Sequence, residues 1–192
     1  MDKMIEGASE LLAGLSAATG DSFSLDDPNF KDTPKRIAKA YMEMCSGLGQ
    51  ESEVTALLST SFPSPYEGMI IIDNIKVFSM CPHHFLPVEY TVDFGYIPQG
   101  QALGLSKIPR FIDLLAKRPV LQEDFTKECI DLFTEVINPA GCIIVVNGQH
   151  GCMRCRGARQ GNSSAITSAV YGNFNDIDTR QEFLELIKMR RG

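Results

Sequence analysis

No stretch of the chain is apolar for the roughly 18 or more residues that a membrane-spanning helix requires. The first residues lack the apolar core of a secretory signal peptide, and no repeat, low-complexity segment or linker interrupts the sequence. With a net charge of −6, the chain carries no general excess of positive charge for binding nucleic acid. These absences predict a cytoplasmic globular protein with neither a membrane nor a nucleic-acid partner.

Histidine is scarce, and all three histidines lie beside cysteines. His83 and His84 closely follow Cys81, and His150 lies just before Cys152. Thiolate and imidazole are the ligands that zinc prefers. Six cysteines in a chain of cytoplasmic character favour thiols and metal ligands over a disulfide framework. The sequence therefore predicts a Zn²⁺ site, the alternative being buried cysteines with surface histidines.

Two ligand sets fit the spacing of these residues. Cys81, His84 and Cys152 would leave a fourth position open, as catalytic zinc sites do, with the two remaining histidines available to carry protons. Adding Cys155 would close a tetrahedral structural site that has no chemistry of its own. The residues alone leave both sets open.

Basic residues are concentrated near the predicted metal site and in one other stretch. Such clusters in an acidic chain favour a small anionic ligand, such as a phosphate ester, over a polymer. With an open zinc position, they indicate metal-assisted hydrolysis of a phosphorylated substrate. The clusters are Lys107, Arg110, Lys117 and Arg118, and then Arg154, Arg156 and Arg159.

The periodicity of apolar residues predicts an α+β fold with an antiparallel sheet covered by helices on one face. Helices are expected at 2–19, from Pro34 to about 47, at 109–118, at 123–137 and from a capping box at Thr179; strands are expected at 69–80, 88–96, 142–147 and 164–174; and 51–68 is expected to be an irregular connector.

Several segments together resemble the GTP cyclohydrolase I family. They occur in family order at 32–39 (DTPKRIAK), 79–84 (SMCPHH), 95–98 (GYIP), 104–110 (GLSKIPR), 118–123 (RPVLQE), 150–157 (HGCMRCRG) and 167–168 (TS). The resemblance implies a tunnelling fold over 66–192, preceded by an N-terminal helical arm and connector at 1–65. It also implies assembly into a homo-oligomeric ring, usually a decamer.

The resemblance further implies an activity and a set of roles. The activity is the zinc-dependent hydrolytic opening of the guanine imidazole ring of GTP, with release of formate and formation of 7,8-dihydroneopterin triphosphate, a precursor of folate and other pterins. The implied zinc ligands are Cys81, His84 and Cys152; the proton-transferring residues are His83 and His150; Glu123 binds the guanine edge with Gln122 beside it; and the triphosphate contacts are Ser106, Lys107, Arg110 and Arg156, with Arg36 and Lys39 contributing to the same pocket.

The chain departs from the usual family motifs at three positions. Pro82 stands where the family usually has glutamate, Asp124 where it has arginine, and Tyr90 where glycine is frequent. Two alternatives follow: a diverged cyclohydrolase that acts on another purine nucleotide or stops at a ring-opened intermediate, or a non-catalytic ring protein that binds zinc and nucleotide.

Overall fold

The structure is a computed structural model that describes residues 1–191, so Gly192, the last residue of the expected second domain, lies outside the described residues. The chain divides into two compact units, Met1–Cys45 and Ser46–Gly192. The first unit consists of α1 (Asp2–Ala18) and α2 (Thr33–Met44), which pack against each other. Among the described residues, no helix combines the length and the apolarity needed to cross a membrane.

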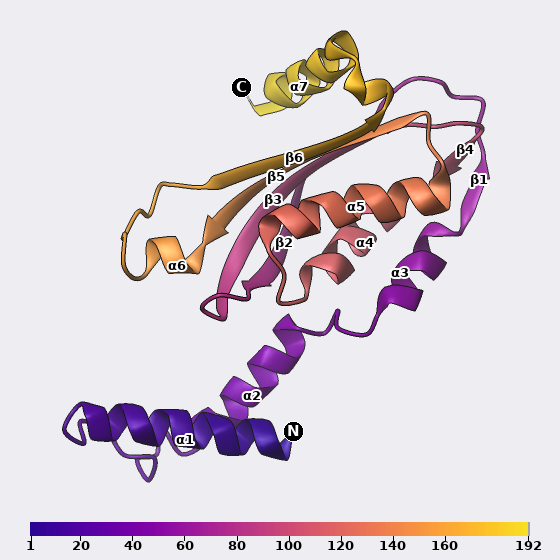
Figure 1. Ribbon diagram of the computed structural model, residues 1–192. Coiled ribbons are helices and arrows are strands. Elements are labelled where there is room, and N and C mark those ends of the chain that lie inside the picture. Colours follow the sequence, from indigo (N-terminus) through magenta and orange to yellow (C-terminus); the bar gives the residue numbers. More distant parts are fainter. Residues whose placement is uncertain (192) are drawn as a thin grey trace. The chain divides into compact units, whose positions relative to one another are not determined.

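The second unit is built around a four-stranded antiparallel sheet with the strand order β2-β3-β5-β6 (Figure 1). Its elements are α3 (Glu51–Leu58), β1 (Ser61–Pro63), β2 (Ile70–Cys81), β3 (Leu86–Ile97), β4 (Gln101–Leu103), α4 (Lys107–Ala116), α5 (Gln122–Ile137), β5 (Gly141–His150), α6 (Gly151–Arg154), β6 (Ala165–Gly172), the 3-10 turn η1 (Asn173–Asn175) and α7 (Ile177–Arg191). The short strands β1 and β4 form a separate pair.

One face of the sheet packs against α4 and α5. Side chains alternate between the two faces of a strand, and from Val88 to Tyr96 every second residue of β3 is fully buried on this side. Phe94 of β3 meets Phe111 of α4 and Phe133 of α5 edge-on, with ring centroids 5.7 and 4.8 Å apart. This aromatic contact fixes both helices on the sheet, and α5 carries part of the site described below.

The opposite face of the sheet is partly covered by α7 (Figure 1). Phe183 and Ile187 pack with Ile143 of β5, and a side chain at Gly95 would meet the Phe183 ring at 2.8 Å. The predicted α+β class and antiparallel sheet are confirmed. Helix α7 also covers part of the second face, because its apolar side chains pack against the odd-numbered residues Ile143 and Val145 of β5.

Two local predictions differ from the structure. Residues expected to form an irregular connector include α3, which buries Val54 and Leu58 in the main core. Their i, i+4 spacing is one turn of helix, a signal too short to stand out among the surrounding Ser, Thr and Pro. The last helix begins before Thr179, because Asp176 accepts hydrogen bonds from the Thr179 backbone N–H and hydroxyl at 2.9 and 3.0 Å.

Candidate functional site

Strand register brings the cysteine and histidine segments to one end of the sheet. Val88 of β3 pairs with Ser79 of β2 on one side and with His150 of β5 on the other. Cys81 and Cys152 each lie two residues beyond these paired positions, so both lie at the same end of the sheet. Segments that are far apart in the sequence therefore converge here.

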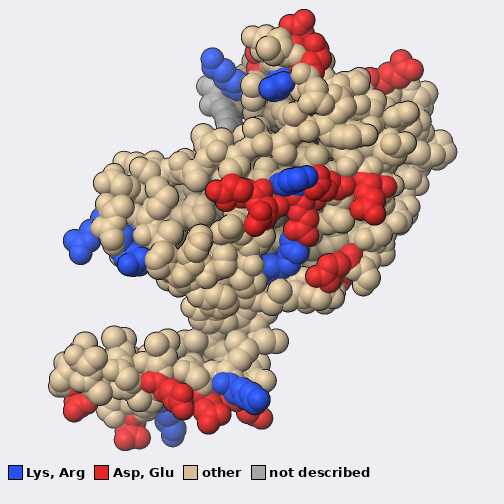
Figure 2. Space-filling model, viewed as in Figure 1, with Lys and Arg blue, Asp and Glu red and all other residues tan. Residues whose placement is uncertain are grey.

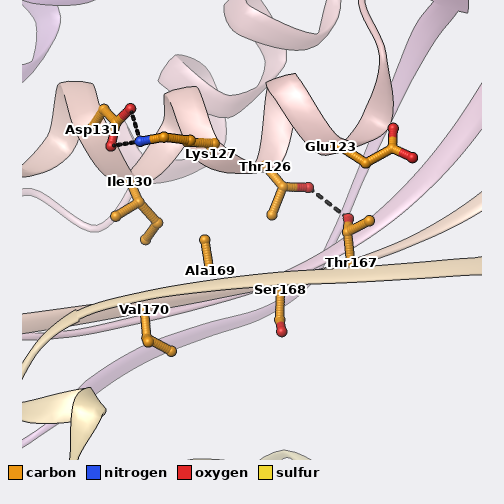
Figure 3. Close-up of a pocket in the computed structure, with 9 residues that line it drawn as sticks. All are labelled: Glu123, Thr126, Lys127, Ile130, Asp131, Thr167, Ser168, Ala169 and Val170. Carbon is orange, nitrogen blue, oxygen red and sulfur yellow. Dashed lines mark hydrogen bonds and ion pairs between the residues drawn. The ribbon is translucent and has the colours of Figure 1, made fainter.

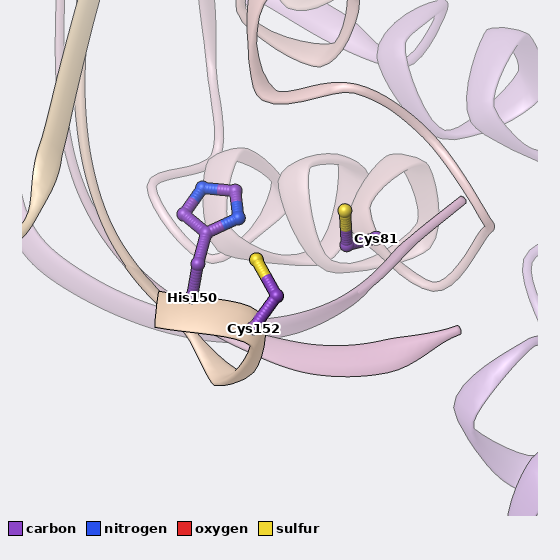
Figure 4. A group of neighbouring side chains, drawn as sticks. All are labelled: Cys81, His150 and Cys152. Carbon is purple, nitrogen blue, oxygen red and sulfur yellow. The ribbon is translucent and has the colours of Figure 1, made fainter. Parts of the chain in front are cut away.

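Cys81, His150 and Cys152 form a group that is suited to hold a metal ion (Figure 4). Their potential ligand atoms all lie within 4.8 Å of one another. Two sulfur ligands of one tetrahedral zinc ion lie about 3.8 Å apart, so small side-chain movements suffice to complete the geometry. Cys81 is buried and the other two are half-buried, so the group is accessible from one side. Two thiols and one imidazole match the preference of zinc and leave a fourth position open.

The two histidines in the turn between β2 and β3 are placed differently. His83 Nδ1 lies 3.8 Å from Cys81 Sγ, and His83 lines the cavity beside the metal group. His84 is exposed and lies outside the metal group. The turn is closed by a hydrogen bond of 3.0 Å from the Phe85 N–H to the Cys81 carbonyl. The structure therefore brings His83 and His150 to the site, and the role of His84 as a ligand stays a prediction.

Gln122 fixes the orientation of His150. Its amide nitrogen donates to the Val146 carbonyl, the Ala165 carbonyl and Thr167 Oγ1 at 3.0–3.1 Å. The amide oxygen is thereby turned toward His150 Nε2 at 2.8 Å. Since this oxygen only accepts, Nε2 carries the proton in the bond, and Nδ1 of the neutral ring keeps its lone pair. The predicted substrate-binding residue Gln122 is thus itself buried and supports His150.

Burial sets the protonation of the rings at this end of the sheet. Burial lowers the pKa of His150 below its usual value, and the nearby carboxylate of Glu123 partly opposes this effect. The imidazole is therefore mainly neutral at pH 7, the form that binds metal or accepts a proton. Burial raises the pKa of Tyr90 to about 12, so its ring, 6.4 Å from that of His150, adds no charge.

A cavity of about 280 Å³ opens beside the metal group. A second hollow, of about 520 Å³, lies between α5 and β6 and shares Glu123 and Thr167 with the first (Figure 3). The hydroxyl groups of Thr126 and Thr167 lie 2.6 Å apart at the junction. The first cavity is lined by Cys81, His83, Val120, Leu121, Gln122, Glu123, His150, Cys152, Met153, Ala165 and Thr167.

Ser106, Lys107, Arg110 and Arg156, the predicted triphosphate-binding residues of the second unit, do not line this cavity. Ser106, Lys107 and Arg110 lie at the start of α4, and the Lys107 ammonium donates to the Leu57 carbonyl at 2.8 Å. Arg156 is exposed in the loop that follows α6. Arg36 and Lys39 are exposed on α2, in the other compact unit, and Arg36 lies 3.6 Å from Asp32. Their roles stay predictions.

Sequence reasoning missed Gly148, because a residue without a side chain gives no chemical signal. A Cβ atom at this position would lie 2.2 Å from Gln122 Oε1 and 3.0 Å from the Tyr90 ring. Strand β5 must therefore carry glycine here for Gln122 to reach His150. Thr126 was also missed, although its partner Thr167 belongs to a family segment.

We expect Gly148→Ala to lower kcat/KM at least about tenfold, because the added methyl group displaces the Gln122 amide that orients His150. Overpacking of this kind also costs about 1–3 kcal/mol of stability, measurable by thermal unfolding. Gly14→Ala in α1 is the control, because a Cβ atom there meets nothing within 4 Å. Full activity of Gly148→Ala would show that Gln122 does not position His150.

Comparison with known proteins agrees with this geometry. Residues 15–188 match the family model described as GTP cyclohydrolase I. GTP cyclohydrolase 1 of Streptomyces coelicolor is 40% identical over 167 residues, covering 86% of this chain and 82% of the relative. GTP cyclohydrolase 1 1 of Pseudomonas aeruginosa is 41% identical over 157 residues, covering 81% and 84%.

GTP cyclohydrolase 1 of Porphyromonas gingivalis is 40% identical over 159 residues, covering 83% of this chain and 82% of the relative. Among solved structures, the apo form of the archaeosine synthase QueF-Like matches with a TM-score of 0.46 and 17% identity, covering 57% of this chain and 97% of that one. The residues that match the family model include Cys81, Cys152, the three histidines and the lining of the cavity beside them. The chain belongs to the GTP cyclohydrolase I family.

Proposed function

We propose that the chain is a zinc-dependent GTP cyclohydrolase. It opens the imidazole ring of the guanine base of GTP by hydrolysis, releases formate and forms 7,8-dihydroneopterin triphosphate for pterin and folate synthesis. The observation that carries the proposal is the convergence of Cys81, Cys152 and His150 on a cavity that Glu123 also lines. We infer GTP as the substrate of this site from the membership of the chain in the family.

A zinc ion held by Cys81 and Cys152, with His84 as the third ligand that the family resemblance implies, would supply Lewis-acid activation of water at neutral pH. His150, oriented by Gln122, presents Nδ1 to the same space and moves a proton during opening of the ring. Glu123 accepts hydrogen bonds from the amino and ring N–H groups of the guanine edge, a pairing that its carboxylate favours. The apolar side chains of Val120 and Met153 line the cavity and keep bulk water from the base.

The charge around the cavity orients the nucleotide. Acidic side chains gather on the exposed face of α5 (Figure 2), including Asp124, Asp131 and Glu135. Arginines, Arg154 and Arg156 among them, follow Cys152 in the loop after α6. A triphosphate is repelled from the first surface and attracted to the second, so we place the phosphates toward the loop and the base against the start of α5.

We also propose that the working protein is a homo-oligomeric ring, with the decamer implied by the resemblance as the expected size. Strands β2 and β6 lie at the two ends of the sheet order, so β6 and the part of β2 before Met80, which itself bridges to Pro119, offer edges to another copy. The start of α4, with Lys107 and Arg110, lies outside the cavity lining, which supports a site completed by neighbouring copies. The six unpaired cysteines support a reducing, cytoplasmic location.

Mixed oligomers test the shared site. We expect Lys107→Ala and Cys152→Ala to be nearly inactive separately, and co-expression of the two to restore part of the activity, because some sites then draw both intact residues from different copies. The measurement is formate release per chain, after the mass of the oligomer has been determined by light scattering. Restoration is excluded if Lys107 and Cys152 of one copy serve the same site.

Product analysis tests the proposed function against its nearest alternative. Pro82 and Asp124 both border the site, one in the turn after Cys81 and the other next to Glu123, so they favour a diverged cyclohydrolase as the second candidate. We expect mass spectrometry of the reaction with GTP to show dihydroneopterin triphosphate. A ring-opened formamide that accumulates, or turnover of a different purine nucleotide alone, would instead establish the diverged enzyme.

A further inference from the structure

Two cysteines lie at the single turn of helix α6, Cys152 within it and Cys155 directly after its last residue, and they differ in their surroundings. Cys152 is half-buried and belongs to the metal group. Cys155, three residues later, is exposed, and its thiol donates to the Gly151 carbonyl at 2.8 Å. Within the part of the chain that the structure describes, Cys155 is outside the metal group and outside the cavity lined by Cys152. The proposed function makes no use of its thiol.

The geometry of one helical turn suits a bond between these two sulfur atoms. Residues three apart in an α-helix have Cα atoms about 5 Å apart. Disulfides span Cα separations of about 4.4–6.8 Å, so rotation of the two side chains suffices and no strand has to move. The loop that follows contains Gly157, which has φ +56°. The residues of this loop are exposed, so the chain after Cys155 is not held by a packed core.

We propose that Cys152 and Cys155 form a reversible disulfide when the zinc-free protein meets a hydroperoxide. The exposed Cys155 sulfur attacks the peroxide O–O bond and becomes a sulfenic acid, and the leaving group departs as water from hydrogen peroxide or as the alcohol from an organic hydroperoxide. The sulfur of Cys152 then attacks the Cys155 sulfur and displaces the hydroxyl, which leaves as water with the thiol proton. Both sulfurs are oxidised by one electron each, and the peroxide oxygens are reduced. The disulfide holds the metal-binding thiol in a form that a dithiol can restore.

Cys81 is the competing partner, because its sulfur also lies within 4.8 Å of the ligand atom of Cys152. Two observations favour Cys155. Cys81 is 6% exposed, whereas Cys155 is open to solvent, and an oxidant in solution reacts first with the accessible thiol. Cys155 is also on the same helical turn as Cys152, whereas Cys81 is held by strand pairing on β2.

The test is hydrogen peroxide treatment of zinc-free and zinc-loaded full-length protein, followed by alkylation, trypsin digestion without reductant and mass spectrometry. Trypsin cleaves after Arg154, which separates the two cysteines. We therefore expect the peptide Glu128–Arg154, which also contains Cys129 and Cys142, to carry the dipeptide Cys155–Arg156 through a disulfide that fragmentation assigns to Cys152. Zinc should slow its formation at least about tenfold, because the bound thiolate is withdrawn from attack.

Variants separate this pair from other thiols. Cys155→Ser should lose the disulfide and keep both its zinc and its activity before oxidation. After peroxide it should regain less than about a tenth of its activity with dithiothreitol and zinc, because Cys152 is then oxidised beyond the reversible stage, whereas the wild type regains most. Cys45→Ser, a substitution outside the metal group, should behave as the wild type.

Two results would overturn the proposal. One is a disulfide that joins Glu128–Arg154 to the Cys81 peptide in place of the Cys155–Arg156 dipeptide. The other is recovery of Cys155→Ser to the wild-type extent. Because the disulfide is read from peptide masses, it is decided independently of whether the protein turns over GTP.

Discussion

Cys152→Ala is expected to remove zinc and to lower the rate of formate release from GTP at least about 10³-fold, because the metal supplies several kcal/mol of transition-state stabilisation. Cys152 is half-buried at the mouth of the site, so the smaller side chain leaves the core intact. The measurement pairs zinc content per chain with the rate of formate release. A folded, zinc-free and inactive variant is the predicted outcome.

Cys142→Ala is a matched control for the loss of a thiol. Cys142 is fully buried on β5, the strand that leads into α6, and lies outside the metal group. Its removal costs packing energy, about 1 kcal/mol or more, and leaves zinc in place. If Cys152→Ala kept a full complement of zinc, the proposed metal centre would be wrong.

His84→Ala and His150→Ala are expected to fail in different ways. The family resemblance makes His84 the third ligand, so its removal should lose zinc. His150 is oriented by Gln122, so His150→Ala should keep most of the zinc and lose about 10²–10⁴-fold in rate, the usual contribution of a general acid or base. Zinc content and single-turnover ring opening distinguish the two failures.

The opposite result, loss of zinc in His150→Ala and retention of zinc in His84→Ala, would identify a different third ligand. In the structure, His150 is the imidazole within 4.8 Å of both thiols, whereas His84 is exposed. If His150→Ala lost the zinc and His84→Ala kept it, the geometric group would be the true ligand set and His84 would have no role in coordination. His83→Ala is the control for zinc content, because His83 lines the cavity and belongs to neither ligand set.

The sequence was sufficient to predict the sheet because its strands carry strong periodic patterns. Alternation along β3 and the β-branched run of β5 identified two core strands whose inward residues are fully buried. Helix α3 was missed because Val54 and Leu58 are its only two buried residues, and they are stabilised by packing against α4 and α5, which the local sequence does not show. A weak local signal was decided by tertiary packing.

The site was predictable in chemistry and less so in geometry. Scarce histidines beside cysteines indicated a metal site, because few other functions concentrate these residue types. The two predicted thiols, Cys81 and Cys152, belong to the metal group, whereas its imidazole is that of His150, which was predicted to carry protons. The role of Gln122 in orienting His150 could not be predicted from the sequence. Its hydrogen-bond partners come from β5 and β6, and the contact depends on the absence of a side chain at Gly148. Residues at the start of α4 were assigned by resemblance alone, and in the structure they lie outside the cavity lining.

Formate release from GTP by the zinc-loaded protein tests the central claim most directly. We expect equal molar amounts of formate and of pterin, the latter measured by its fluorescence after oxidation, with both products abolished by a chelator and restored by added zinc. Protein with one zinc per chain, intact oligomer and neither product from GTP would contradict it. That result would leave the cavity beside Cys81 and Cys152 as a binding site without cyclohydrolase chemistry.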